Sequence, residues 1–557
     1  MAPSYQISAT DICLFLVAVF LIYKVSTNRK SIATELRGPP SRSWLFGLAN
    51  VIRNSEDVGL LYEQWSAEYG SVYTISGFLG QQKLVLCDPK AVAHFYSREA
   101  VVYVKTPIIR RIIEIMVYSE RIWYGWKETY IEGNLSLSRI ATGNAAIRDL
   151  THVFYDSAHR TSSAWDAILE ASDGTSTIDV QNWYVVPGDN NDRLTPISKD
   201  ESHLVRQSFK HIALNGSSNY PPRMDSIGIA GFSHDFGAID GKPQIFDSLD
   251  LSSGAVFFAF TVIVGSVFPA VLRLPSKRKG SLAAMNRVFT SIADQLLAKA
   301  KEHGNEEDKS VLGLLLKSET DGADIHMSRE EIIAQNLLLL AGYETTSISL
   351  TWALIEMCKN VDIQNKLRTE LVQFGNTDPT WEQLNSSLPY LDAVVHEALR
   401  THPPVSETTR VAAEDDILPL TTPVVTRSGE TIDSIFVAKG TLLTTPIRTL
   451  NRSEEIWGPD AKEFKPERWL EDNAPRAKEI KGHRHLLTFV NGPRTCLGKT
   501  FALTEFKAAL FVIVKNFAFE FPGGRDTVIS KHSGSVLPRP KVAGEEGARV
   551  PLRVRRV

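Results

Sequence analysis

The sequence predicts a mainly helical (α+β) protein: one large helical domain with small β-sheets, preceded by an N-terminal transmembrane helix. Three observations predict this class. An uninterrupted apolar run covers residues 12–23, helical patterns dominate from about 283 to 400, and short β-rich runs occupy 71–89 and 411–445. A last helical pattern covers 499–517. No internal repeat divides the chain, so we expect one catalytic domain over residues 46–557.

The composition is that of a globular protein. The chain has 557 residues, of which 43% are hydrophobic and 22% are charged. These values are close to average usage and exclude a disordered chain. Its 4 cysteines are far apart in sequence, so they make neither a disulfide framework nor a C-x-x-C pair. The formal net charge of -3 argues against nucleic-acid binding through a basic surface.

Residues 1–30 are predicted to be a membrane anchor. The run Ile12–Tyr23, extended back to Tyr5, nearly reaches the length of about 20 residues that a spanning helix needs. Basic residues follow the run and Asp11 is the only charged residue before it, which places the rest of the chain in the cytosol. A cleaved signal peptide is the alternative, but it needs basic residues before the run. Residues 31–45, with Gly38-Pro39-Pro40, are predicted to be a stiff extended hinge.

A long central helix is predicted from residue 332 to 360. The pair Ser328 and Glu331 forms a capping box before it, and the apolar pattern goes almost all round, so the helix should be buried. Ala341, Gly342 and Thr345 share one face of this helix. Two interpretations stay open: either the small residues leave room for a ligand, or the threonine hydroxyl bonds back to the carbonyl four residues earlier.

An E-x-x-R pair ends the next predicted helix, residues 388–400. Glu397 and Arg400 are three residues apart and therefore meet on one helical face. Taken alone, such a pair is more often an exposed ion pair worth under about 1 kcal/mol. His402-Pro403-Pro404 stops the helix, and Arg468 follows in a P-E-R-W loop.

The segment Phe489–Gly498 predicts a cysteine loop at the start of the last helix. Gly492 and Gly498 allow a tight loop and the close approach of a flat ligand. A cysteine at a helix N-terminus is favoured as thiolate, so Cys496 is a candidate metal ligand. Arg494 can pair with an anionic group such as a haem propionate, and Phe489 can shield the sulfur.

These motifs closely resemble those of the cytochrome P450 family, the haem-thiolate monooxygenases. The match F-x-x-G-x-R-x-C-x-G occurs in the family's order with A-G-x-E-T-T, E-x-x-R, H-P-P and P-E-R-W. The anchor and the Gly-Pro-Pro hinge are similar to those of the microsomal type. The resemblance covers residues 36–116, 145–183 and 223–545, and leans toward fungal enzymes of secondary metabolism or xenobiotic oxidation.

The resemblance implies a role for each matching residue. Cys496 would be the axial ligand of the iron of haem b, with Phe489, Gly492 and Gly498 forming its loop. Arg494 matches the propionate-binding arginine of the family, and Arg410 stands where related proteins often keep a second. His402 either touches a propionate or caps its turn.

Two further groups of residues take roles from the same resemblance. Glu344 and Thr345 would be the catalytic residues that deliver protons during dioxygen activation, beside an oxygen groove made by Ala341 and Gly342. Glu397, Arg400 and Arg468 would form a structural ion-pair cluster.

The implied function is a monooxygenase of the endoplasmic reticulum membrane, single-pass, with a cytosolic catalytic domain. It would use dioxygen and electrons from NADPH, through a separate NADPH-cytochrome P450 reductase, to oxidise an apolar organic substrate. A basic run could dock that partner or be a solvated loop: Arg476, Lys478, Lys481, Arg484 and Lys499. The alternatives are a haem-thiolate isomerase, dehydratase or peroxygenase, and an impaired membrane protein with defective haem binding.

Two segments depart from the family pattern. The family usually carries a W-x-x-x-R helix near residues 117–144, but neither Trp123 nor Trp126 is followed by that arginine. Residues 184–222 are polar and loop-like, which is unusual inside a compact domain. We interpret both segments as gene-model errors, a misread frame and a retained intron. Sequencing the transcript tests this, because a message that encodes both segments as written would contradict it.

Overall fold

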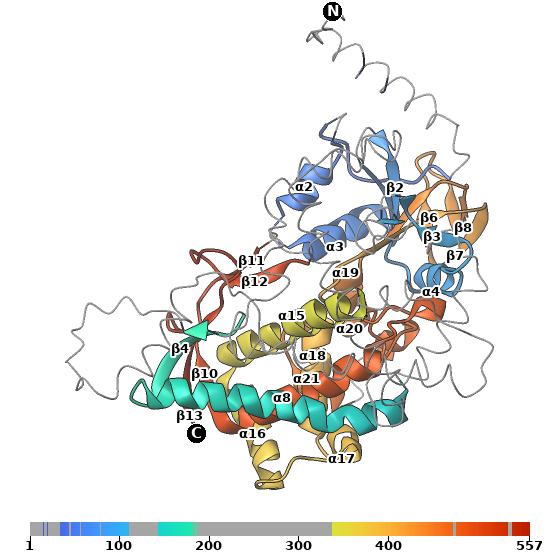
Figure 1. The fold of residues 1–557 in the computed structure, drawn as a ribbon. Coiled ribbons are helices and arrows are strands. Elements are labelled where there is room, and N and C mark those ends of the chain that lie inside the picture. Colours follow the sequence, from blue (N-terminus) through green and yellow to red (C-terminus); the bar gives the residue numbers. More distant parts are fainter. Residues whose placement is uncertain are drawn as a thin grey trace, which may run out of the picture. The chain divides into compact units, whose positions relative to one another are not determined.

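The computed structural model describes residues 34–43, 46–55, 57–77, 80–107, 109–110, 143–181, 184–185, 337–471, 475–532 and 537–557, and the single residues Phe15, Val19 and Asp294. The chain divides into two compact units. Unit 1 comprises Met1–Lys105 and Thr408–Pro446, and unit 2 comprises Thr106–Glu407 and Ile447–Val557. Each unit is assembled from two separate stretches of sequence, so the sequence shows no single linker between the two units. Figure 1 labels their helices and strands.

Unit 1 contains a five-stranded sheet with the order β1-β2-β9-β6-β3. β2 and β9 run parallel, and the other neighbours run antiparallel. The sheet strands are β1 (Val72–Ser76), β2 (Gln82–Leu86), β3 (Tyr103–Lys105), β6 (Thr408–Ala412) and β9 (Leu442–Thr445). The described residues of unit 1 also form a separate hairpin and three helices: β7 (Asp416–Val425), β8 (Thr431–Val437), α2 (Ala49–Arg53), α3 (Val58–Tyr69) and α4 (Pro89–Ser97). The predicted strands at 71–89 and 411–445 are confirmed.

Part of the predicted hinge is fixed to unit 1. The Thr74 backbone N–H donates to the Arg37 carbonyl at 3.0 Å, and the Thr74 hydroxyl donates to the Leu36 carbonyl at 3.2 Å. Leu36 is buried and forms a β-bridge with Thr426. A Cβ on Gly38 would lie 1.8 Å from the Thr74 carbonyl oxygen, so only glycine fits this close approach. Residues 36–38 are therefore held by the β-structure of unit 1.

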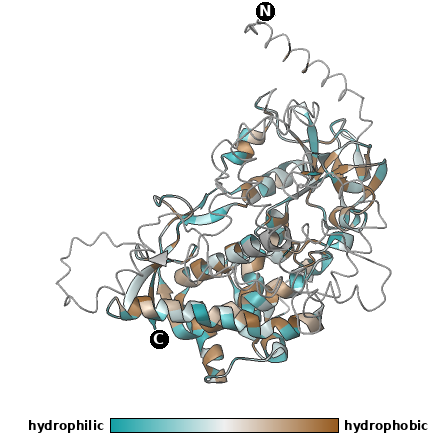
Figure 2. Cartoon of the chain, viewed as in Figure 1, coloured by the Kyte–Doolittle hydropathy of each residue, from teal (hydrophilic) through white to brown (hydrophobic). Residues whose placement is uncertain are grey.

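Unit 2 is mainly helical. The helix α8 (Asn144–Glu170) carries polar and apolar residues along its length and packs beside α21 (Lys499–Asn516) (Figures 1 and 2). The other α-helices in the described part of unit 2 are α15 (Leu337–Lys359), α16 (Val361–Leu371), α17 (Trp381–Ser386), α18 (Pro389–Thr401), α19 (Ile447–Asn451) and α20 (Glu454–Trp457). The 3-10 helices described there are η4 (Val372–Phe374), η5 (Pro466–Trp469), η6 (Pro475–Glu479) and η7 (Gly492–Arg494). The helices predicted before Arg400 and after Cys496 are confirmed.

Two small sheets complete unit 2. The first has the order β10-β13-β4-β5, and the second pairs β11 with β12. Their strands are β4 (Thr175–Asp179), β5 (Tyr184–Val185), β10 (Phe517–Glu520), β11 (Ile529–His532), β12 (Arg539–Val542) and β13 (Pro551–Arg556). All neighbouring strands are antiparallel. Small sheets beside a helical body agree with the predicted fold class.

Several predictions fall on residues outside the described ranges. These are the membrane anchor apart from Phe15 and Val19, the capping box before the central helix, and nearly all of 117–144 and 184–222. Within the described part of the chain, none of the helices has the length and apolar character needed to cross a bilayer. The anchor and the gene-model errors stay predictions.

Candidate active site

The central helix α15 is the first of the two elements that carry the predicted site. The buried hydrophobic residues include Ile348, Leu350 and Cys358, in agreement with the predicted all-round burial. The helix packs against α16, α18, α21 and the strands β10 and β12. A helix surrounded in this way is a rigid support for the polar residues at positions 344–346.

Of the two open interpretations of the Ala341–Thr345 face, the structure shows the back-bonded threonine, and the room for a ligand stays a prediction. The Thr345 hydroxyl donates to the Ala341 carbonyl at 2.8 Å, as expected for a back-bonded threonine. Ala341 is nevertheless exposed, and Gly342 and Thr345 are partly exposed, so this face stays accessible. The hydroxyl oxygen keeps its lone pairs for a second hydrogen bond.

Glu344 points to a different surface. Its side chain is buried, and Oε1 accepts hydrogen bonds from the Leu537 backbone N–H at 3.3 Å and from the Arg539 guanidinium at 3.4 Å. Burial raises the pKa of Glu344, while Arg539 and the Leu537 N–H act in the opposite direction. Arg539 and Leu537 had no signal in the sequence, because they are almost two hundred residues away from Glu344.

The cysteine loop is the second element, and it is folded by its own backbone. The Cys496 N–H donates to the Phe489 carbonyl at 2.9 Å, which closes the loop. Gly492 has φ +73° and Val490 has φ +51°, so the chain turns through two left-handed residues. α21 then begins at Lys499, three residues after Cys496, with Gly498 as its N-cap. The loop therefore presents the sulfur at a helix N-terminus, as the sequence predicts.

The electrostatics of Cys496 include opposing contributions. The surrounding protein raises the pKa of the thiol, and the Gly498 N–H and the Lys499 charge lower it.

Cys496 is exposed, whereas Cys358 is buried and Cys87 is half-buried. Phe489 is buried, and its ring packs against His483 with centroids 6.0 Å apart. Of the three cysteines in the described ranges, Cys496 is thus the one that a ligand can reach.

The loop also offers a free cation and an open glycine. Arg494 is partly exposed and forms no ion pair or hydrogen bond with any residue that the structure describes. Gly498 has an ordinary backbone conformation, and a Cβ there would meet no described atom within 4 Å. Packing within the described protein therefore does not require glycine at 498, and the surface there is open to a flat ligand.

Arg410 lies in unit 1, on β6. It forms an ion pair with Glu99, whose side chain is almost fully buried, and donates to the Thr409 carbonyl at 3.0 Å. A propionate at Arg410 would share the guanidinium with Glu99.

The structural cluster of Glu397, Arg400 and Arg468 is fully buried. Arg400 Nη2 and Nε reach the two carboxylate oxygens of Glu397 at 2.7 and 2.8 Å, and Arg468 Nε lies 3.4 Å from Oε1. The interpretation of an isolated exposed pair is therefore wrong here, and the cluster implied by the resemblance is confirmed. The sequence did not indicate two further members, Asp460 and Trp469, which bond to Arg468 and Glu397.

His402 bonds to the central helix. Its Nε2 lies 2.8 Å from Glu356 Oε1, and its ring stacks on Trp352 with centroids 3.8 Å apart. Its backbone N–H donates to the Ala398 carbonyl, so it caps α18. A neutral His402 that donates through Nε2 has only an acceptor at Nδ1, which is buried and makes no hydrogen bond within the described residues. This arrangement favours capping, because a propionate needs a donor.

We expect His402 to make the protein sensitive to mild acid. Burial lowers the pKa of His402 to about 4 from an ordinary 6.5, against the opposing effect of Glu356. The stability contributed by neutral His402 is complete above pH 6.5 and is lost as the pH falls to about 4. Between these pH values, the slope of the unfolding free energy against pH should therefore be smaller in His402→Asn than in the wild type, by about 1.4 kcal/mol per pH unit.

The measurement is chemical unfolding at a series of pH values. His152 provides the control, since it is exposed and, among the described residues, its ring hydrogen-bonds only to a nearby backbone carbonyl, that of Asp149. His152→Asn should keep the slope of the wild-type protein. An unchanged slope in His402→Asn would contradict the prediction.

An accessible cysteine at a helix N-terminus, with an arginine two residues away that pairs with no described residue, can hold a flat anionic cofactor through its sulfur. That is the chemistry of haem-thiolate proteins. The family model described as Cytochrome P450 matches residues 222–543. The chain is 49% identical to cytochrome P450 monooxygenase claP of Ampulloclitocybe clavipes, over 100% of both chains. It is 31% identical to cytochrome P450 monooxygenase 128 of Postia placenta, over 93% of this chain and 92% of that protein.

A third relative is the ganoderic acid synthetase CYP5150L8 of Ganoderma lucidum, 28% identical over 87% of this chain and 88% of that protein. The chain belongs to the cytochrome P450 family, and it is a P450 monooxygenase.

The family uses a haem iron, and the residues of the cysteine loop fit that group. Cys496 would supply a thiolate ligand, Arg494 would supply a cation that has no partner among the described residues, and Gly498 would leave an open surface. When bound, the haem supplies the iron that activates dioxygen. With the haem bound, the loop would present the sulfur, Phe489 would shield it, and Glu344 and Thr345 would hold protons.

Proposed function

We propose that this protein is a haem b monooxygenase that inserts one atom of dioxygen into an apolar organic substrate. The observation that carries the proposal is the cysteine loop, in which Cys496 is exposed just before α21 and Arg494, two residues away, has no partner among the residues that the structure describes. The names of the relatives, monooxygenases and a ganoderic acid synthetase, favour a substrate from secondary metabolism.

We further propose that Cys496 is the axial ligand and Arg494 the main propionate partner. Arg410 is a weaker candidate for a propionate, because Glu99 already pairs with it. Glu344 and Thr345 deliver protons, and the accessible Ala341 and Gly342 make room for dioxygen.

The electrons come from NADPH through a separate NADPH-cytochrome P450 reductase, and residues 1–30 hold the protein in the endoplasmic reticulum membrane as a single-pass anchor. The apolar run Ile12–Tyr23 and the basic residues after it support this topology. The basic run is a weaker argument for reductase docking. Arg476 pairs with Glu455 and Glu479, and Arg484 pairs with Asp392, so part of its charge is neutralised within the protein.

The proposal is tested with the full chain, expressed in yeast microsomes together with a P450 reductase. We expect the reduced, carbon-monoxide-bound protein to show the band of a thiolate-ligated haem, and NADPH to be consumed with oxidation of an apolar substrate. Haem uptake without any NADPH-dependent oxidation, but with conversion that needs no reductant, would point to an isomerase or dehydratase. No haem uptake would contradict the proposal and point to the impaired protein.

A further inference from the structure

Within the described part of the chain, Glu344 is held through one carboxylate oxygen only. Arg539 Nε and Nη2 both lie 3.4 Å from Oε1, and the Leu537 N–H lies 3.3 Å from the same atom. Oε2 accepts no hydrogen bond from any residue in the described part of the chain. Charge-assisted hydrogen bonds are usually about 2.7–2.9 Å long, so this contact is loose. The carboxylate is therefore oriented by its Oε1 while its Oε2 stays available.

Arg539 is the cation that acts on this carboxylate. It is the first residue of β12, and β12 packs against α15. Among the described elements, α16, α18, α21 and β10 also pack against α15, and none of their charged groups is among the groups that shift the pKa of Glu344. On the hairpin itself, His532 lies opposite Arg539 in the β11–β12 register, and Lys541 is two residues further on the same strand face. Burial, Lys541 and Arg539 lower the pKa of His532, and neither His532 nor Lys541 is among the groups that shift the pKa of Glu344.

Side-chain burial shows why the contact matters. The side chains of Glu344 and Arg539 are 5% and 10% exposed. A buried carboxyl is held neutral by desolvation unless a cation opposes it. Since burial is the largest influence on the Glu344 pKa and raises it, removal of Arg539 would leave that influence unopposed by any charge.

We propose that Arg539 is a positioning residue for Glu344. Its guanidinium, on β12, binds Oε1 of Glu344 and leaves Oε2 to take up and release the proton needed for turnover. This rests on the proposed role of Glu344 in proton delivery. The loose grip at 3.4 Å lets the carboxyl turn away from Arg539 when it carries a proton, because a neutral carboxyl loses most of its attraction to the guanidinium.

The first test is the pH profile of NADPH-dependent oxidation, with the holoenzyme and a reductase. Arg539→Met should move the limb governed by Glu344 to higher pH by about one unit, and Arg539→Lys should return it toward the wild type. In the Glu344→Gln background, Arg539→Met should cause no further movement. Lys541→Met is the matched control, because Lys541 lies on the same strand face but bonds to the Glu545 carbonyl, and it should leave the profile unchanged.

The second test needs no turnover. A carboxyl whose folded-state pKa is raised contributes stability that is present below the unfolded-state pKa and is lost as pH rises through the folded-state value. As the pH rises, the unfolding midpoint should therefore continue to fall up to a higher pH in Arg539→Met than in the wild type. Glu344→Gln should remove this fall, alone and together with Arg539→Met.

An Arg539→Met profile that does not move, or that still moves in the Glu344→Gln background, overturns the proposal. If Arg539→Met does not fold, Arg539→Lys decides the question, since a shorter cation should give a smaller movement in the same direction and no movement overturns it. A wild-type protein without haem or turnover contradicts the proposed function instead, and the unfolding series still reports on the Glu344–Arg539 pair.

Discussion

The Cys496→Ser protein should fold but lose the carbon monoxide band of a thiolate-ligated haem, and its turnover should fall by at least about 100-fold. A serine hydroxyl is a hard, weakly acidic ligand, whereas the thiolate is soft and donates electron density to the iron. Changes to groups that merely support a metal ligand already cost 10–100-fold. The loss of the ligand itself should cost at least as much.

The loop should survive this substitution, because its closure does not use the sulfur. The Cys496 N–H still reaches the Phe489 carbonyl, and Thr495 still bonds to the Gly492 carbonyl. Haem content, the reduced carbon monoxide spectrum and the far-ultraviolet circular dichroism spectrum separate ligand loss from unfolding.

Cys87→Ser is the matched control for the same chemical change. Cys87 is half-buried in unit 1, directly after β2, and its N–H donates to the Ser71 carbonyl. We expect its spectrum and turnover to match those of the wild type. If Cys496→Ser kept the thiolate band, or if Cys87→Ser lost it, the assignment of Cys496 as the iron ligand would be contradicted.

The sequence was most informative where a structure is local. The cysteine loop depends on glycines, a proline and a helix start within ten residues, and its backbone bonds join residues at most seven apart. The pair Glu397 and Arg400 meets for the same reason, because both lie on one helical turn. Only the burial of that pair required the structure, since burial depends on which distant segments cover it.

The parts that could not be predicted depend on long-range pairing. Arg539 meets Glu344 only because the β11–β12 hairpin packs against α15, and the short strands of that hairpin carry no clear alternating pattern. His402 had two possible roles in the sequence, and its bond to Glu356 joins residues 46 apart. The Thr345 hydroxyl is the intermediate case: its bond to Ala341 is local, but the exposure of that face is set by tertiary packing.

Arg400→Met should destabilise unit 2 by about 3–5 kcal/mol, because it leaves the buried carboxylate of Glu397 without its main partner. Every N–H of the Arg400 guanidinium has an acceptor in this structure. Two of the acceptors are the Glu397 oxygens, and the others are the backbone carbonyls of Asn451, Ala461 and Glu463. The methionine side chain is of similar length to that of arginine but can form none of these hydrogen bonds, because it has no donor.

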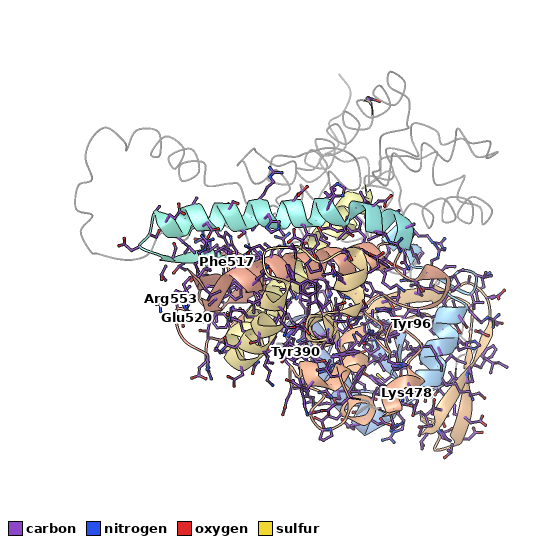
Figure 3. The ribbon with its side chains drawn as sticks, turned by 90° about the horizontal axis from the view of Figure 1, so that it is seen from below. Tyr96, Tyr390, Lys478, Phe517, Glu520 and Arg553 are labelled. Atoms are coloured by element: carbon purple, nitrogen blue, oxygen red, sulfur yellow. The ribbon has the colours of Figure 1, made fainter. Side chains whose placement is uncertain are left out.

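The same substitution at the protein surface provides the control. Arg553 pairs with Glu520 across β10 and β13 at 3.0 Å, and the two labelled side chains lie together at the edge of unit 2 in Figure 3. They are 49% and 59% exposed, so Arg553→Met should cost less than about 1 kcal/mol. Denaturant unfolding followed by circular dichroism measures both. Equal losses in the two variants would mean that burial of the Glu397–Arg400 pair does not determine its contribution. A large loss of stability in Arg400→Met alone, accompanied by loss of haem, would show that the cluster supports the cysteine loop. The connection runs through Asn451: Arg400 donates to its backbone carbonyl. The Asn451 side chain in turn bonds to the Leu487 N–H and to Thr488, just before Phe489.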